Sequence, residues 1–437
     1  MLTRFNQGHL GELLKGGAIS LVLKLVAALL AFVMSIAAAR LLGAEVAGYY
    51  FLAVSIVSVL AMMARVGLDQ VVTREVVAGL EEGNVPKIRG LYRQAFWLVA
   101  LVSTIFSLCV VGLSDWLAQD VFNKPQLATV LSYMGWAVIP FALAMLHGQF
   151  FQGLKHMPLM QLSQGLGLSL LMLVAIGGSL LGAHLWSASQ FGLLYLLCWL
   201  LVMLFLAGCW QRMQGWAPRQ SFPLGPLLLA AMPFWGVMSL NMVLQWGGPI
   251  LLGYWAESDQ VAIFLAALRT AMLVTIVLMA VNSIAAPKFA AQYHRGDMQG
   301  LQQVAVWSTR LMLLLCTPAV AFLLLFPEWV MGLFGAEFTA GSQVLVILVL
   351  GQLVNVATGS VGWLLSMTGH GTDLLKSTAL AALLMLALCA WLVPLYGMQG
   401  AAWAQTAALS LQMLTNTCFV KYRLGFVPMN IFAKINN

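Results

Sequence analysis

The stretch that decides the fold is residues 39–53, which read Ala39-Arg40-Leu41-Leu42-Gly43-Ala44-Glu45-Val46-Ala47-Gly48-Tyr49-Tyr50-Phe51-Leu52-Ala53. Part of it recurs half a chain later, and two other dipeptides recur at the same interval of about 213 residues. The matching pairs are Phe51-Leu52-Ala53 with Phe264-Leu265-Ala266, Gly83-Asn84 with Gly296-Asp297, and Asp115-Trp116 with Glu328-Trp329. An internal repeat of this size in an apolar chain predicts a transporter built from two similar halves, with its site between them.

Composition places the chain in the membrane. Hydrophobic residues make up 62% of its 437 positions and charged residues only 8%, too few to cover a soluble surface. The apolar residues come in runs of about 20, the length that spans a hydrocarbon layer of about 30 Å. We count about twelve runs, near 18–42, 47–66, 94–114, 127–149, 160–182, 189–209, 226–250, 260–284, 306–326, 342–366, 376–395 and 399–419. The sequence therefore predicts an all-α polytopic membrane protein.

The distribution of charge predicts the topology. With the N-terminus assigned to the cytoplasm, one side receives nearly all the basic residues between the runs, and the other receives Lys124, with Arg40 at its border. The basic side holds Arg4, Lys15, Arg65, Arg74, Lys87, Arg89, Arg93, Lys155, Arg212, Arg219, Lys288, Arg295, Lys376, Lys421, Arg423 and Lys434. This is the positive-inside bias, and it predicts that both termini are cytoplasmic. The net charge of +7 thus reports topology and affinity for anionic membrane lipids, and we expect no nucleic-acid partner.

The runs divide six and six. We expect an N-terminal six-helix bundle over residues 1–210, a cytoplasmic linker over 211–225, a C-terminal six-helix bundle over 226–420 and a cytoplasmic tail over 421–437. Because six is an even number, both halves enter the membrane from the same side, which makes a parallel repeat. The two longest cytoplasmic loops are 67–93 and 287–304. The first has amphipathic spacing suited to a short interfacial helix.

Several kinds of chemistry have no support in the sequence. There is no nucleotide-binding G-x-x-x-x-G-K-[ST] motif, no arrangement resembling a catalytic triad and no C-x-x-C pair among the six cysteines. We therefore predict no catalytic residues, no metal site and no cofactor, and we predict that the protein is not an enzyme. No Asp or Glu lies near the middle of a run, where a cation-coupled transporter would normally place one.

The charged residues that do fall inside the runs are basic. Lys24 lies in the first run, Arg269 well inside the eighth and Arg310 near the start of the ninth. One interpretation is a cationic cavity that receives a phosphate or pyrophosphate group. The other is that these long side chains reach back to the interface. Arg269 is the deepest and is the first candidate for substrate binding, followed by Lys24. Arg65, at the end of the second run, is a topology anchor or lines the entrance.

Uncharged polar pairs form a second candidate set. Asn241 and Gln245 are four residues apart and share one face of the seventh helix, and Gln352 and Asn355 do the same in the tenth. Such pairs bind sugar hydroxyls in a water-filled cavity, or they hydrogen-bond between helices for about 0.6 kcal/mol each.

Residues 39–53, together with Arg65-Val66-Gly67-Leu68-Asp69 and Arg74-Glu75, resemble the polysaccharide transporter (oligosaccharide flippase) family. The family pattern is filled by Arg40, Leu41, Leu42, Gly43, Glu45, Gly48, Tyr49 and Ala53. This family belongs to the superfamily that also holds the multidrug and toxic compound extrusion antiporters and the lipid II flippases. The resemblance implies two six-helix bundles around a central cavity, alternating access and a lipid-linked saccharide as substrate.

We therefore predict a flippase of the bacterial inner membrane for polyprenyl-pyrophosphate-linked oligosaccharide, such as an O-antigen or another surface polysaccharide unit. The expected partners are this substrate, membrane lipids, and the polysaccharide polymerase and chain-length machinery. A multidrug antiporter of the same superfamily is the alternative, although organic cations favour acidic or aromatic cavities and the embedded charges here are positive. A membrane glycan polymerase or ligase is a further alternative, for which the short outer loops offer only scattered carboxylates.

Overall fold

The computed structural model describes residues 2–180, 186–214 and 222–429, and within these ranges the regular structure is helical throughout. The chain forms two compact units, Met1–Ser239 and Leu240–Asn437, and each is described by itself. The boundary between the units falls inside one helix, α10 (Leu224–Trp255). Part of the predicted linker (215–221, with Arg219) and part of the predicted tail (430–437, with Lys434) lie outside the described residues.

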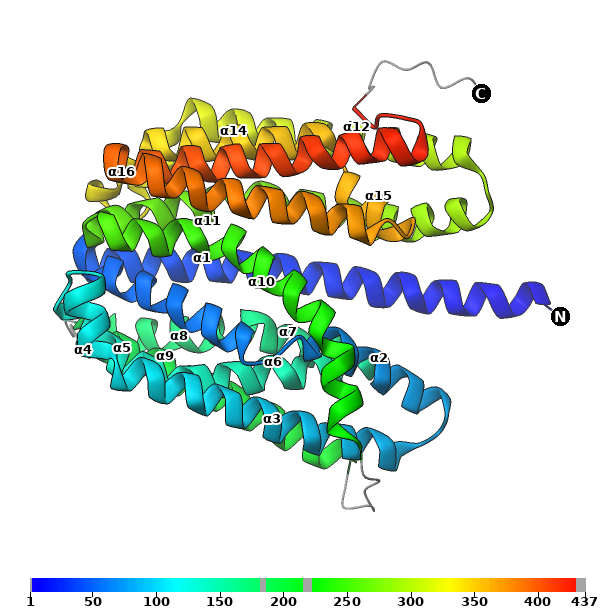
Figure 1. Ribbon diagram of the computed structural model, residues 1–437, viewed down its shortest axis with the longest axis horizontal. Coiled ribbons are helices and arrows are strands. Elements are labelled where there is room, and N and C mark those ends of the chain that lie inside the picture. Colours follow the sequence, from blue (N-terminus) through cyan, green and yellow to red (C-terminus); the bar gives the residue numbers. More distant parts are fainter. Residues whose placement is uncertain (1, 181–185, 215–221, 430–437) are drawn as a thin grey trace. The chain divides into compact units, whose positions relative to one another are not determined.

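The first unit is built on long helices joined by short ones (Figure 1). Its helices are α1 (Leu2–Met63), α2 (Leu68–Glu81), α3 (Val85–Gly112), α4 (Ser114–Trp116), α5 (Gln126–Met134), α6 (Val138–Gly153), α7 (Met157–Gln161), α8 (Gly167–Leu180), α9 (Ala188–Gln214) and the first part of α10.

The second unit begins within α10 and is likewise built of long helices joined by short ones (Figure 1). Its other helices are α11 (Ser258–His294), α12 (Met298–Leu325), α13 (Pro327–Gly332), α14 (Ser342–Thr358), α15 (Val361–Met367) and α16 (Gly371–Leu424).

The span count agrees with the sequence. Within the described residues, 10 helical segments are long and apolar enough to cross a membrane. Two of them are too long for one crossing, because the 62 residues of α1 and the 54 of α16 would extend about 90 and 80 Å as straight rods. Each contains one residue with non-helical backbone, Gly43 (φ 73°, ψ 168°) in α1 and Gly397 (φ 55°, ψ −130°) in α16. Dividing both at these glycines gives the twelve predicted spans, and the all-α polytopic fold is confirmed.

Polar contacts show that α16 doubles back at Gly397. Arg423 Nε donates to Asp373 Oδ2 at 2.7 Å, and Gln412 Nε2 donates to Thr378 Oγ1 at 3.0 Å. In each pair the two residues lie at similar distances in sequence on either side of Gly397. The two halves of α16 are therefore antiparallel neighbours, as the orange and red segments of Figure 1 show.

The repeat detected in the sequence has the same local geometry in both units. Gly83 and Gly296 have positive φ angles of 64° and 72°. The next residue caps the following helix in each case: Asn84 Oδ1 accepts from Lys87 N at 3.0 Å, and Asp297 Oδ1 accepts from Gly300 N at 2.8 Å. The carboxylate–tryptophan dipeptides lie in the short helices α4 and α13, directly after the long helices that those caps begin. The two halves of the chain thus share the local structure of this turn and cap as well as the repeated residues.

Residues 39–53 form part of the core of the first unit. Ala39, Phe51 and Ala53 are almost completely buried. The Tyr50 ring packs edge-on against Phe191 of α9, with ring centroids 5.0 Å apart. Arg40 and Glu45 are the exposed charged residues of the stretch. Its role in the structure is to break α1 at Gly43 and to pack the second half of α1 onto α9.

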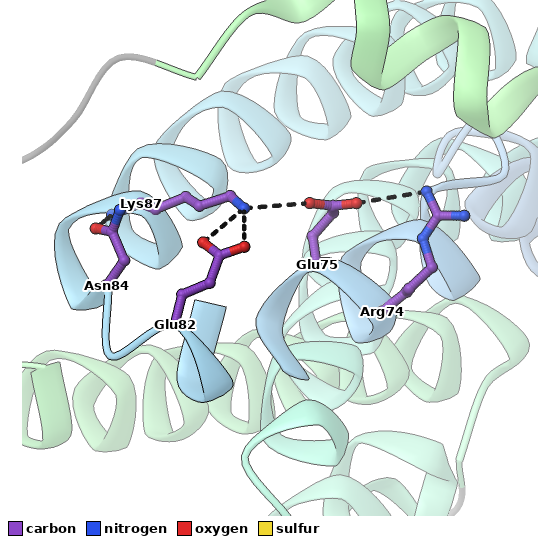
Figure 2. A network of polar contacts seen from close by, with 5 residues as sticks. All are labelled: Arg74, Glu75, Glu82, Asn84 and Lys87. Carbon is purple, nitrogen blue, oxygen red and sulfur yellow. Dashed lines mark hydrogen bonds and ion pairs between the residues drawn. The ribbon is translucent and has the colours of Figure 1, made fainter. Parts of the chain in front are cut away.

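The short helix predicted after the second span is present as α2, but its apolar face is not free to enter a bilayer. Val71, Val72 and Val76 are buried, and α2 packs against α6. Ion pairs fix its far end to the start of α3 (Figure 2): Lys87 Nζ lies 3.1 Å from Glu82 and 3.9 Å from Glu75. The helix is confirmed, and the structure places Val71, Val72 and Val76 inside the protein, while Val77 and Leu80 stay exposed.

The second predicted loop, 287–304, is mostly helix. Helix α11 continues through Pro287 to His294, and α12 begins at Met298, so only residues 295–297 connect them. The segment between the eighth and ninth apolar runs is therefore helical, because the Gly296-Asp297 turn joins two helices that extend beyond those runs.

We expect residues 372 and 423 to lie on the same side of the membrane, opposite to residue 397, because α16 is a hairpin of two spans. Reporter fusions after Thr372, Gly397 and Arg423 test this order. Opposite readings after Thr372 and Arg423 would contradict the hairpin.

We expect Gly397→Ala to destabilise the protein by about 1–3 kcal/mol, because alanine strains the backbone at this positive φ. An added Cβ would also lie 2.5 Å from Gln260 Oε1. Gly177→Ala in α8 is the matched control, since no atom of the other described residues is found within 4 Å of its added Cβ. Thermal unfolding of the purified proteins should show a lower Tm for Gly397→Ala alone.

Candidate functional site: a polar cavity beside a broken helix

A break divides the predicted tenth span, 342–366, into two helices. Helix α14 ends at Thr358, and α15 begins at Val361. The intervening Gly359 has φ 72° and ψ −149°, a conformation open essentially to glycine alone. An added Cβ there would overlap Thr309 Oγ1. Non-helical backbone at membrane depth is tolerated where it lies within protein or lines a water-filled cavity.

Gly359 lines a cavity of about 420 Å³ within the second unit. Helices α11, α14, α15 and α16 contribute its walls. The lining residues are Thr275, Leu278, Met279, Asn282, Asn355, Gly359, Ser360, Gly362, Trp363, Ser366, Leu374 and Met413. None of these lining residues is charged. Hydroxyl and amide groups alternate with apolar ones, and the Trp363 side chain is 48% exposed.

Hydrogen bonds hold the polar wall in place. Ser360 Oγ, beside the break, donates to Asn282 Oδ1 on α11. On α14, Asn355 Nδ2 donates to Gln352 Oε1 at 3.2 Å. These bonds use one side-chain polar atom of each asparagine. The side-chain nitrogen Nδ2 of Asn282 and the side-chain oxygen Oδ1 of Asn355 therefore keep the capacity to bind a ligand. An amide donor, an amide acceptor, hydroxyls and an indole ring together match the surface of a sugar.

The structure places the predicted polar residues in different surroundings. Asn355 lines the cavity, and its bond to Gln352 lies within one helix, so this pair does not join two helices as glue. Asn241 and Gln245 are exposed on α10. Arg269 is half-buried on α11, the helix that also carries Thr275 and Asn282, and Lys24 is exposed on α1. Neither basic residue is among those lining this cavity.

Arg65 is 1% exposed and forms an ion pair with Asp69, with Nη1 and Oδ2 2.7 Å apart. The pair bridges the turn between α1 and α2, where Gly67 has φ 74° and packs against the backbone of α10 at Ala231 and Trp235. Burial raises the pKa of Asp69 above its ordinary value, and the Arg65 guanidinium opposes that rise. Arg65 therefore holds a turn and does not present its charge to a cavity.

The sequence analysis named only Asn355 among the lining residues and missed the others, including Asn282, Ser360 and Trp363. The one signal available was the Gly359-Ser360 dipeptide inside an apolar run, which is typical of a helix break. The pairing of Ser360 with Asn282, 78 residues away, depends on how α11 packs against α14 and α15.

Comparison with known proteins identifies a family and relatives that are similar to this chain. The family model described as "Polysaccharide biosynthesis protein" matches residues 13–291. A protein of Haloferax volcanii described as a probable low-salt glycan biosynthesis flippase, Agl15, is 26% identical over 187 residues. That match covers 42% of this chain and 39% of the relative.

Solved structures share the fold over nearly the whole chain. The inward closed conformation of the lipid II flippase MurJ has a TM-score of 0.75 at 12% identity, covering 96% of this chain and 90% of that one. A MOP superfamily transporter from Pyrococcus furiosus has a TM-score of 0.70 at 15% identity, covering 94% and 96%. An inward-facing MATE multidrug resistance transporter has a TM-score of 0.68 at 13% identity, covering 90% and 94%.

The resemblance seen in residues 39–53 is thus confirmed over a much longer stretch. At identities this low the solved structures show the fold alone, and the family model carries the assignment. The family model matches more than half of the residues of this chain, and the solved structures share its fold. The chain therefore belongs to the polysaccharide biosynthesis protein family, and it is a multi-pass membrane protein with the fold of the MOP-superfamily transporters.

Proposed function

We propose that the protein is a flippase that moves a polyprenyl-pyrophosphate-linked oligosaccharide across the inner membrane of a bacterium by alternating access. The lipid tail stays in the hydrocarbon while the protein shields the sugar and its charged head group. Both termini and the turn between α2 and α3 then face the cytoplasm, in keeping with the positive-inside bias.

The observation that carries the proposal is the uncharged polar cavity beside Gly359. Sugars present hydroxyl groups that both donate and accept, together with apolar ring faces, and the cavity offers Asn282, Asn355 and Trp363 for these. Organic cations favour acidic cavities or cages of several aromatic faces, and the lining residues include no carboxylate and a single aromatic ring, Trp363. This chemistry supports a glycan over the cationic drugs of the multidrug antiporters.

The pyrophosphate needs a different partner. We assign it to Arg269 and Lys24, the two basic residues placed within spans of different units, with Asn241 and Gln245 as further polar contacts. A guanidinium matches phosphate oxygens with paired N–H donors, whereas lysine acts as a point charge. In this proposal the sugar is bound by the second unit, and the charged linkage by Arg269 and Lys24.

Two experiments test the function itself. Deleting the gene should remove a surface glycan and leave drug sensitivity unchanged. The purified protein in vesicles should move a fluorescent lipid-linked oligosaccharide between leaflets without polymerising or transferring it. Increased drug sensitivity with intact glycan would identify an antiporter, and glycan transfer without transbilayer movement would identify an enzyme.

We expect Trp363→Ala to lower the rate of flipping roughly tenfold, because losing an aromatic contact to the sugar removes on the order of 1.4 kcal/mol. Trp391→Ala is the matched control, since Trp391 is also exposed but does not line the cavity. Flipping should be measured at equal protein abundance in the vesicles. Equal effects of the two substitutions would contradict a role of Trp363 in sugar binding.

We expect Arg269→Ala to abolish flipping at normal protein abundance, because the pyrophosphate loses its main cation. Arg269→Lys should retain part of the activity, since the charge remains and the fork of N–H donors is lost. Lys24→Ala should have a milder effect than Arg269→Ala. Full flipping by the Arg269→Ala, Lys24→Ala double variant would exclude the cationic mechanism and leave the sugar cavity untouched.

A further inference from the structure

The first unit contains a second cavity with the opposite chemistry. It has a volume of about 510 Å³ and lies between one face of α3 and one face of α9. Its lining residues are Arg89, Tyr92, Arg93, Phe96, Trp97, Met203, Leu204, Ala207, Trp210 and Gln211. Two arginines one helical turn apart thus share a wall with aromatic and aliphatic side chains, and no lining residue is acidic.

Arg89 has donors without an acceptor. Its Nε and Nη1 atoms are buried and have no hydrogen-bond partner among the described residues. In the described part of the chain, neither Arg89 nor Arg93 lies in an ion pair. The carboxylates of Glu75 and Glu82 pair with Lys87, two residues before Arg89 (Figure 2). Leaving buried donors unpaired is costly, and like charges four residues apart on a helix repel. An anion between the two guanidinium groups would remove both costs.

The floor of the cavity is rigid. The Tyr92 ring stacks on Trp210 of α9, with centroids 4.5 Å apart and planes 23° apart. The Tyr92 hydroxyl is 2.9 Å from His147 Nε2 on α6, and His147 Nδ1 is 2.7 Å from the Leu143 carbonyl oxygen. Helix α6 packs against both α3 and α9. The arginines therefore project from a wall whose position is fixed by three helices.

An apolar surface continues from the arginines along the same two helices. On α3, Trp97 is 64% exposed, and the exposed residues that follow it are Leu101, Ile105 and Leu108. The exposed large apolar residues of α9 include Leu197, Leu201, Leu204 and Phe205. Wholly apolar, exposed faces on membrane spans fit acyl chains, whereas a path for a soluble anion would be polar.

We propose that this cavity binds the phosphate of an anionic membrane phospholipid. Arg89 and Arg93 hold the head group at the end of α3 that we predict to be cytoplasmic, and the acyl chains lie along the apolar faces of α3 and α9. Basic pockets between membrane helices bind anionic head groups in this way. The site belongs to the first unit alone and does not depend on which substrate the protein transports.

The test measures lipid binding by the purified, delipidated full chain. Native mass spectrometry and the shift in Tm should report binding of phosphatidylglycerol to the wild type. Phosphatidylcholine with the same acyl chains should bind weakly, and millimolar inorganic phosphate should give no shift in Tm. The Arg89→Gln, Arg93→Gln variant should bind phosphatidylglycerol at least about tenfold more weakly, because each lost charged hydrogen bond contributes about that factor.

Two further variants keep the test decisive. Lys288→Gln, Arg295→Gln removes the same number of positive charges from exposed positions of the second unit and should bind like the wild type. Ala207→Phe narrows the cavity without changing charge and should weaken binding, even if the double arginine variant fails to fold. Equal binding of the two lipids, an equal loss in the Lys288 and Arg295 control, or an equal Tm shift with inorganic phosphate would each overturn the proposal.

Discussion

In hydrocarbon, a backbone N–H or C=O group without a partner costs several kcal/mol, and this constraint governs the rest of the structure. Helices satisfy it over each span, so every departure from helical backbone needs a local reason. At Gly43 and Gly397 the reason is that each helix as a straight rod would be far longer than the membrane is thick. Gly359 differs, because it interrupts a single span and lines a cavity. Ser360 and Asn282 supply polar atoms there, so the same break that costs helical bonds also creates a surface able to bind a polar ligand.

The two halves of the chain share the turns and caps at which their helices begin, but their cavities differ in chemistry. Gly83-Asn84 and Gly296-Asp297 form the same turn and cap, which any pair of antiparallel helices could use. By contrast, Arg89 and its neighbours give the first unit a basic cavity, and Asn355 and its neighbours give the second a neutral one. Turns and caps depend on local backbone geometry and tolerate duplication. Cavities depend on side chains from several helices, so each half can change its own without disturbing the common frame.

This difference also explains what the sequence could predict. Span number and helix α2 follow from signals within about 20 residues, and both appear in the structure. The cavity residues do not follow in this way, because Ser360 meets Asn282 only through tertiary packing. The sequence shows where Arg65 lies along its span, but it does not show where the side chain points. In the structure the Arg65 side chain is buried against Asp69. Position in a span thus gave no measure of access to a ligand.

The charges of the chain cannot all be neutralised internally. It has 21 lysines and arginines against 14 aspartates and glutamates, so a net charge of +7 has to be balanced by water, lipid or ligand. Lys87, Arg65 and Arg423 meet carboxylates at helix ends and turns. Arg89 has buried donors that no described carboxylate reaches. In a membrane the abundant anion beside such a group is a lipid phosphate, already held at the interface by its acyl chains. A basic cavity with an apolar extension therefore recruits its counter-ion from the bilayer itself, and no acidic residue of the chain is required to complete it.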